Sequence, residues 1–113
     1  MGSKQEELCL EILARTDFRE VNAKSDFGRT ALHWAALDGL VGVCRAILCR
    51  SDFREVNALD HLSSSTALHI AAQKGFAEIC LAILTHADFV QINAKAEFGR
   101  TALHWAALQG LDE

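Results

Sequence analysis

The 113-residue sequence has no proline and no tyrosine, and it has neither a long apolar run nor a basic one. No stretch approaches the ~20 apolar residues that a membrane helix needs, and Met1–Glu11 lacks the apolar core of a signal peptide. The 11 basic and 15 acidic side chains are intermixed and give a net charge of −4, which disfavours the counterion release behind most nucleic-acid binding. We therefore expect no membrane and no nucleic acid among the partners, and a soluble protein of the cytoplasm or the nucleus.

The residue patterns of catalysis and metal binding are also missing. No Cys-x-x-Cys pair or Cys/His cluster has the spacing of a zinc site. No nucleophile with a matching base, phosphate-binding loop or carboxylate pair stands out. We expect no catalytic residue, no metal and no cofactor.

What the sequence contains instead is a repeat of 35 to 36 residues. The segment Thr30–Gly39, TALHWAALDG, returns as Thr66–Gly75 and as Thr101–Gly110, and the starts lie 36 and 35 residues apart. The motif FREVNA or FVQINA keeps the same rhythm at residues 18–23, 53–58 and 89–94. A fixed period of this length indicates stacked supersecondary units, and the length and apolar content suffice for one core.

Each unit is predicted to hold two helices. Apolar residues on helical spacing predict one helix over residues 5–15, with copies over 41–50 and 77–86. A shorter helix with a small-residue face follows the N-cap residue Thr30 and stops at Gly39, as its copies stop at Gly75 and Gly110. Residues 17–29 are predicted to form a projecting loop or hairpin, with Gly28 suited to a positive φ.

Three of the four cysteines follow the same period. Cys9, Cys44 and Cys80 would lie ~8–10 Å apart in stacked helices, whereas a disulfide needs Cα atoms within ~7 Å. We expect them to be small buried core residues in a reducing compartment. Cys49 stands where the other units have Ala14 and Thr85, and nothing in the sequence assigns it a role.

With these motifs the sequence resembles the ankyrin repeat family. The family signature T-P-L-H-x-A is matched at residues 30–35, 66–71 and 101–106, with alanine where the family prefers proline. Alanine lacks the preset φ of proline, so each first turn is less pre-organised. The resemblance covers residues 5–110 and implies an all-α repeat solenoid of helix-turn-helix units joined by projecting loops or β-hairpins.

The predicted organisation is one ankyrin repeat domain over residues 1–113. It comprises the second helix of a partial repeat (5–16), two repeats (17–51 and 52–87) and a partial repeat that ends after its first helix (88–113).

Two features depart from the family pattern. The period exceeds the family's ~33 residues, and the extra length follows the helix-ending glycine, which predicts a longer second helix or a longer exit loop. The middle loop, Leu59–Ser65, is one residue longer than its neighbours and lacks their Phe-Gly-Arg tip.

The recurring histidines are predicted to be structural residues rather than ligands or catalytic bases. The resemblance implies that His33, His69 and His104 each bond the threonine of their own repeat and reach towards the neighbouring one, and three copies of one histidine do not make a ligand set. His61 and His86 occur once each and are predicted to be solvated.

Tryptophan and asparagine also recur in register. Trp34 and Trp105, with Ile70 between them, are predicted to pack against the core, and partial exposure as binding anchors is the alternative. The asparagines of the FREVNA motif are predicted to hold the backbone of their own loops; they are Asn22, Asn57 and Asn93.

The resemblance implies a non-catalytic module that binds a protein partner through loop tips and the concave face of the first helices. Exposed Phe and Arg beside acidic residues suit protein contacts. By position, the candidate partner-binding residues are Asp26, Phe27, Arg29, Leu37, Asp38, Asp60, His61, Leu62, Gln73, Lys74, Glu97, Phe98, Arg100, Leu108 and Gln109.

The sequence opens on a second helix and closes on a first helix, so its two ends are complementary halves of one repeat. The last helix is expected to leave apolar residues uncovered, namely Leu103, Ala106, Ala107, Leu108 and Leu111. Two explanations stay open. The chain is a piece of a longer scaffold array, which the near-identity of residues 22–39 and 93–110 favours, or it self-associates end to end, with one chain's N-terminal helix completing another's last repeat.

Overall fold

The computed structural model describes residues 3–110, and these form six α-helices and two short 3-10 turns. The helices are α1 (Lys4–Ala14), α2 (Ala31–Asp38), α3 (Val41–Cys49), α4 (Ala67–Lys74), α5 (Ala77–Leu84) and α6 (Ala102–Gly110), and the turns are η1 (Asp26–Gly28) and η2 (Glu97–Gly99). Residues 3–110 contain no strand, so the predicted all-α solenoid is confirmed and its connections are loops rather than β-hairpins.

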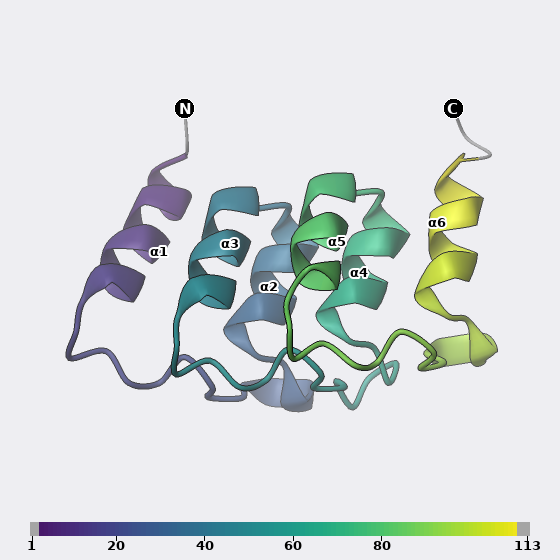
Figure 1. Cartoon of the computed structure of the whole chain (residues 1–113), viewed down its shortest axis with the longest axis horizontal. Coiled ribbons are helices and arrows are strands. Elements are labelled where there is room, and N and C mark those ends of the chain that lie inside the picture. The colour runs from purple at the N-terminus through teal and green to yellow at the C-terminus, as the bar shows by residue number, and fades with distance from the viewer. Residues whose placement is uncertain (1–2, 111–113) are drawn as a thin grey trace.

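The helices stand in two rows (Figure 1). The second helices α1, α3 and α5 pack on one another in order, and so do the first helices α2, α4 and α6. Within a unit, α2 packs on α3 and α4 packs on α5. All the long connections run along the same edge of the stack, where η1 and η2 also lie. α1 and α6 occupy its opposite ends.

The first helices begin and end as their local sequence predicts. The Thr30 hydroxyl accepts the N–H of His33, and the His33 ring accepts the N–H of Thr30, which is a reciprocal capping box. Gly39 ends α2 in the left-handed conformation at φ 73°, which glycine adopts at low cost. α4 repeats both features, whereas α6 includes Gly110 instead of stopping before it.

The second helices are shorter than predicted at their C-terminal ends. α3 stops at Cys49 and α5 at Leu84, one and two residues before the predicted ends. The extra residues of each unit therefore lie in the exit loop. There a turn closed by the Phe53 N–H and the Arg50 carbonyl places the Phe53 ring in the core, where it is 3% exposed.

The core lies between the two rows. It is built from branched aliphatic residues of the second helices, such as Ile47, Ile79 and Ile83, and from the leucine and alanines of the first helices. Of the periodic cysteines, only Cys44 is buried, and its burial raises the pKa of the thiol to about 12. Cys9 and Cys80 are half-buried at the edge of this core, so the prediction of full burial is right for one of three.

Candidate protein-binding surface

Each buried histidine joins its own repeat to the next one. The Nδ1 atom of His33 accepts the Thr30 N–H at 3.1 Å, which leaves Nε2–H to donate to the Ser65 carbonyl at 3.0 Å. His69 repeats the arrangement with Thr66 and with the Ala94 carbonyl, at 3.1 and 2.9 Å. The structural interpretation of these histidines is confirmed.

The third copy, His104, makes only the hydrogen bonds to the threonine of its own repeat. Its Nδ1 accepts the Thr101 N–H at 3.0 Å, but the side chain is exposed, and residues 3–110 offer no acceptor to its Nε2. The described part of the chain holds no further repeat that could supply one.

Burial lowers the pKa of His33 below its usual value of 6.5, although the Ser65 carbonyl opposes the shift. The unfolded chain therefore takes up a proton at His33 at a higher pH than the folded chain does. The contribution of neutral His33 to the free energy of unfolding should be fully present above pH ~6.5. It should be lost progressively as the pH drops below that value. We expect urea unfolding between pH 7.5 and 5.5 to show a larger loss of stability in the wild type than in His33→Gln. An identical pH dependence in both would contradict this assignment.

Two of the three recurring asparagines, Asn22 and Asn57, bind the loop of the next unit, so the prediction that they hold their own loops is wrong for these two. The Asn22 amide donates to the Asp52 carbonyl and accepts the Arg54 N–H, both at 2.7 Å. Asn57 makes the same pair of bonds further along the stack, to Asp88 and Val90, both at 2.8 Å. A side-chain amide with one donor and one acceptor engaged fixes the spacing of two neighbouring loops.

The loop tips present aromatic side chains. Phe27 lies in η1 at φ 66°, and Phe98 lies in η2 at φ 64°, a region that residues other than glycine seldom occupy. Phe27 is 54% exposed and Phe98 is 81% exposed. The predicted positive φ of Gly28 is confirmed at 69°.

Two arginines next to these tips stack on aromatic rings. The Arg29 guanidinium lies 5.2 Å from the centre of the Trp34 ring and bonds the Asp60 carboxylate at 3.2 Å. Arg100 lies 4.8 Å from the Trp105 ring and 5.7 Å from the Phe98 ring. Cation–π stacking therefore reaches the tip ring itself at Phe98, whereas Arg29 stacks on the ring of α2 beside the first tip; both arginines are half-buried.

The sequence predicts Asp60 to be a surface residue, but the structure shows it to be buried, with 2% of the residue exposed. Its carboxylate accepts the N–H groups of Ser63 and Ser65 and the Arg29 guanidinium. Burial alone would raise the pKa of Asp60, but these hydrogen bonds outweigh it and hold the pKa below its ordinary value. The middle loop is thus folded around a buried acid in place of a Phe-Gly-Arg tip.

Of the two single histidines, His61 is solvated as predicted and His86 is less so. His61 is exposed, yet its N–H donates to the Phe27 carbonyl at 2.6 Å and its ring covers Gly28. His86 is half-buried, and its Nδ1 accepts the Asp88 N–H at 3.2 Å.

A comparison with protein families decides the class of this stack. A family model described as ankyrin repeats in three copies matches residues 42–113. The chain belongs to the ankyrin repeat family. Ankyrin repeats generally mediate protein–protein interactions and are typically non-catalytic. No curated protein matches the chain.

Most of the predicted partner-binding residues of the ankyrin stack lie where a partner could touch them. The exposed ones are Asp26, Phe27, Asp38, His61, Leu62, Gln73, Lys74, Glu97, Phe98 and Leu108. The half-buried ones are Arg29, Leu37, Arg100 and Gln109. Gln109 is already engaged, since its amide donates to the Gln73 carbonyl.

The two tryptophans of the ankyrin repeats differ in exposure although their local sequences match. Trp105 is half-buried against the core and Ile70 is 5% exposed, as the packing prediction requires. Trp34 is 42% exposed, so that prediction is wrong for this residue. No neighbouring first helix covers it within residues 3–110.

Trp34 instead lines a groove of about 340 Å³ at the α1 end of the stack. The lining is almost entirely apolar and comes from α1, α2, α3 and the segments next to them: Cys9, Ile12, Leu13, Phe18, Ala31, Trp34, Ala35, Asp38, Leu40, Val43 and Ile47. No motif in the sequence predicts this groove.

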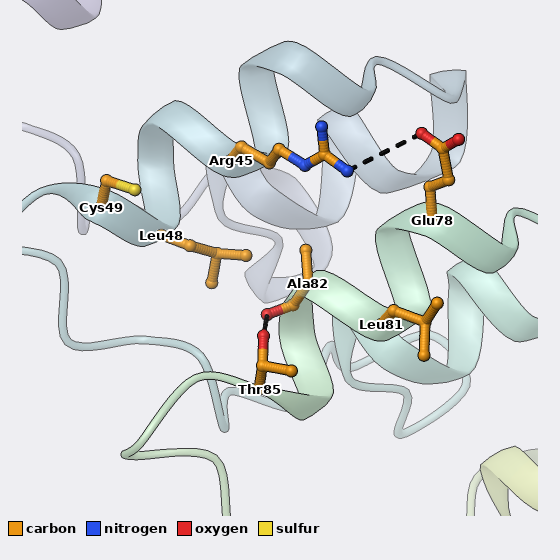
Figure 2. Close-up of a pocket in the computed structure, with 7 residues that line it drawn as sticks. All are labelled: Arg45, Leu48, Cys49, Glu78, Leu81, Ala82 and Thr85. Carbon is orange, nitrogen blue, oxygen red and sulfur yellow. Dashed lines mark hydrogen bonds and ion pairs between the residues drawn. The ribbon is translucent and has the colours of Figure 1, made fainter.

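A second hollow of about 390 Å³ lies between α3 and α5 (Figure 2). Arg45 and Glu78 face each other across it at 3.8 Å, and the Thr85 hydroxyl is turned to the Ala82 carbonyl of its own helix. No set of polar groups converges in this hollow. Among residues 3–110 there is no group of three or more potential metal ligands, and no helix has the length and apolar content that crossing a bilayer demands.

Proposed function

We propose that this ankyrin domain is a non-catalytic interaction module that binds a protein partner through its loop tips and the concave face of its first helices. The observation that carries the proposal is the pair of exposed phenylalanines at the loop tips, Phe27 and Phe98. Rigid aromatic side chains bury a large apolar area on binding and lose little conformational entropy. Acidic residues and an arginine beside each ring supply the polar rim of such an interface.

The partner-binding residues that we propose are those predicted from the sequence, without the buried Asp60. The repeats divide at residues 17–51 and 52–87, with partial repeats on either side, as proposed from the period. All four cysteines are free, which suits a reducing compartment, so we place the module in the cytoplasm or the nucleus.

Removing both tip rings should abolish partner capture. The double variant Phe27→Ala with Phe98→Ala removes two exposed side chains, so we expect it to fold normally. Immobilised wild type, this double variant and Leu81→Ala would be exposed to the same cell lysate, with retained proteins quantified by mass spectrometry. Leu81 is 60% exposed on α5, in the row of second helices, and serves as the matched control.

We expect a set of proteins that is retained by the wild type and by Leu81→Ala and is reduced at least tenfold on the double variant. A tenfold loss corresponds to ~1.4 kcal/mol, a modest value for two interface aromatics. If the double variant retains the same proteins in the same amounts, the loop tips are not the binding surface.

A second candidate function is a self-associating structural segment of an ankyrin array. Apolar surface at both ends of the described stack favours it. Trp34 is 42% exposed and Ile12 is 43% exposed at one end, and Leu103 is 78% exposed at the other. Ala106, Ala107 and Leu108 are also exposed, as predicted, while Leu111 lies outside the described residues.

A further inference from the structure

We propose that the groove beside α1 and α2 binds α6 of a second copy of this chain, so that copies join head to tail. The inference rests on the second candidate function and supplies its binding site, occupant and register. It does not depend on the loop-tip surface.

The groove lies beside α1 and α2 at the position that corresponds to the one α2 fills between α3 and α4. One unit further along, α2 packs between α3 and α4. The residues there that correspond to Ile12 and Trp34 are Ile47 and Ile70, and they are 1% and 5% exposed. At the groove, Ile12 and Trp34 are 43% and 42% exposed. A first helix is therefore what the groove lacks.

The α4–α6 interface shows that a tryptophan at this position accepts a first helix. There α4 packs on α6, Ala102 is 6% exposed and Trp105 is half-buried. Residues 31–37 of α2 and 102–108 of α6 are identical in sequence. The face of α2 that lines the groove is thus the same surface that α4 already covers on α6.

The opposite face of α6 is the surface that the groove would cover. Leu103 is 78% exposed, whereas its counterparts Leu32 and Leu68 are 1% and 2% exposed because the next unit packs on them. Ala107 is exposed too, while the corresponding alanines of α2 and α4 are buried. Both partners of the interface are apolar and uncovered in the described chain.

Polar groups stand in register on the two ends. Asn22 and Asn57 each bind a carbonyl and an N–H of the next unit's loop. Asn93 is exposed and has no such partners within residues 3–110. The corresponding groups of the second copy are the Asp17 carbonyl and the Arg19 N–H, by the repeat alignment.

The free Nε2 of His104 and the exposed Arg15 extend this match. His33 donates to the Ser65 carbonyl and His69 to the Ala94 carbonyl of the next unit, and the residues of the second copy that align with these acceptors are Arg29 and Ala23. Arg50, the counterpart of Arg15, donates at 2.7 Å to the Leu13 carbonyl of the preceding unit and to the Phe18 carbonyl at the start of its own, whereas Arg15 bonds only Asp17 of its own loop. At the internal interfaces these asparagine, histidine and arginine side chains are paired, whereas their counterparts at the two ends of the described stack are not.

Three acidic side chains make this interface weaker than the internal ones. Glu7 and Glu11 of α1 stand where α3 has Gly42 and Ala46, and they would face α5 of the other copy. Asp38 stands where α6 has Gln109, whose amide donates to a carbonyl of the first helix packed on it. A carboxylate cannot donate this bond, so Asp38→Gln should strengthen association.

The test uses light-scattering mass after size exclusion over a hundredfold range of concentration. Ala31→Arg blocks the groove, and Leu103→Arg blocks the face of α6; both residues are exposed, so folding should be preserved. Leu59→Arg in the middle loop is the matched control, since Leu59 is 41% exposed, belongs to neither end, and stands where the neighbouring units have Lys24 and Lys95. Circular dichroism melts confirm that each variant is folded.

We expect the mass of the wild type and of Leu59→Arg to rise with concentration beyond two chains, because a head-to-tail contact leaves new ends open. Each blocked variant alone should stay at one chain, their equimolar mixture should reach two chains and no more, and Asp38→Gln should associate at severalfold lower concentration. A wild type that stays at one chain throughout overturns both this inference and the second candidate function. Association of either blocked variant alone, or a mixture that stays at one chain, overturns the head-to-tail register but leaves self-association standing.

Discussion

Replacing Ile79 by alanine is expected to lower the free energy of unfolding by about 3–4 kcal/mol. Ile79 lies on α5, is completely buried, and belongs to the core between the two helix rows. The substitution removes buried methyl and methylene groups and leaves a cavity that the packed helices can fill only in part. Urea unfolding followed by circular dichroism would measure the change.

Leu81→Ala on the same helix is the matched control for this experiment, because Leu81 is 60% exposed. We expect it to change the stability by less than ~1 kcal/mol. Since each unit contacts only its neighbours, loss of Ile79 should also reduce cooperativity along the stack. Equal losses for the two variants would mean that the core does not lie between the rows as described.

His69→Ala is expected to destabilise the fold by about 3 kcal/mol. The imidazole accepts the Thr66 N–H and donates to the Ala94 carbonyl, and both partners would lose their bonds in a water-poor site. An unpaired buried polar group costs ~1–3 kcal/mol, and the lost ring leaves a cavity as well.

His104→Ala separates the local part of this effect from the part between repeats. His104 has the same bonds to its own threonine, but it is exposed and makes no bond to a following unit within residues 3–110. We expect it to cost ~1 kcal/mol, the value of a helix cap. The difference between the two variants measures the hydrogen bond and the packing between repeats. A cost for His104→Ala as large as that for His69→Ala would remove the distinction.

The parts of the fold that could be predicted are those that a short segment determines by itself. Thr30 and Gly39 mark the ends of α2 because the capping bonds and the left-handed glycine involve only residues within one helix. The repeat period then predicts the same helix at two further positions, those of α4 and α6. The direction of the histidine bonds followed from the family resemblance rather than from the residues alone.

The parts that could not be predicted depend on partners in another unit. The local sequence of Asn22 predicts a bond to its own loop, but its partners, Asp52 and Arg54, lie 30 and 32 residues away. The position of Asp60 in a loop predicts exposure, because no local feature shows that the loop closes around its carboxylate.

The two tryptophans show the same limit most clearly. Trp34 and Trp105 share the local sequence TALHWAAL, yet Trp34 is 42% exposed and Trp105 packs against the core. The difference lies in whether a first helix stands next to them, which neither local sequence records. For this reason the sequence does not predict the groove at Trp34.

The central claim is that the two ends of this ankyrin stack repeat its internal interface, and the indole resonances of Trp34 and Trp105 test it most directly. Leu103→Arg labelled with ¹⁵N keeps its groove intact, and unlabelled Ala31→Arg supplies an intact α6. On mixing, the indole N–H resonance of Trp34 should shift and saturate at one equivalent, while that of Trp105, which faces α4 within its own chain, should stay in place. An unmoved Trp34 resonance, or an equal shift of both, would contradict the account.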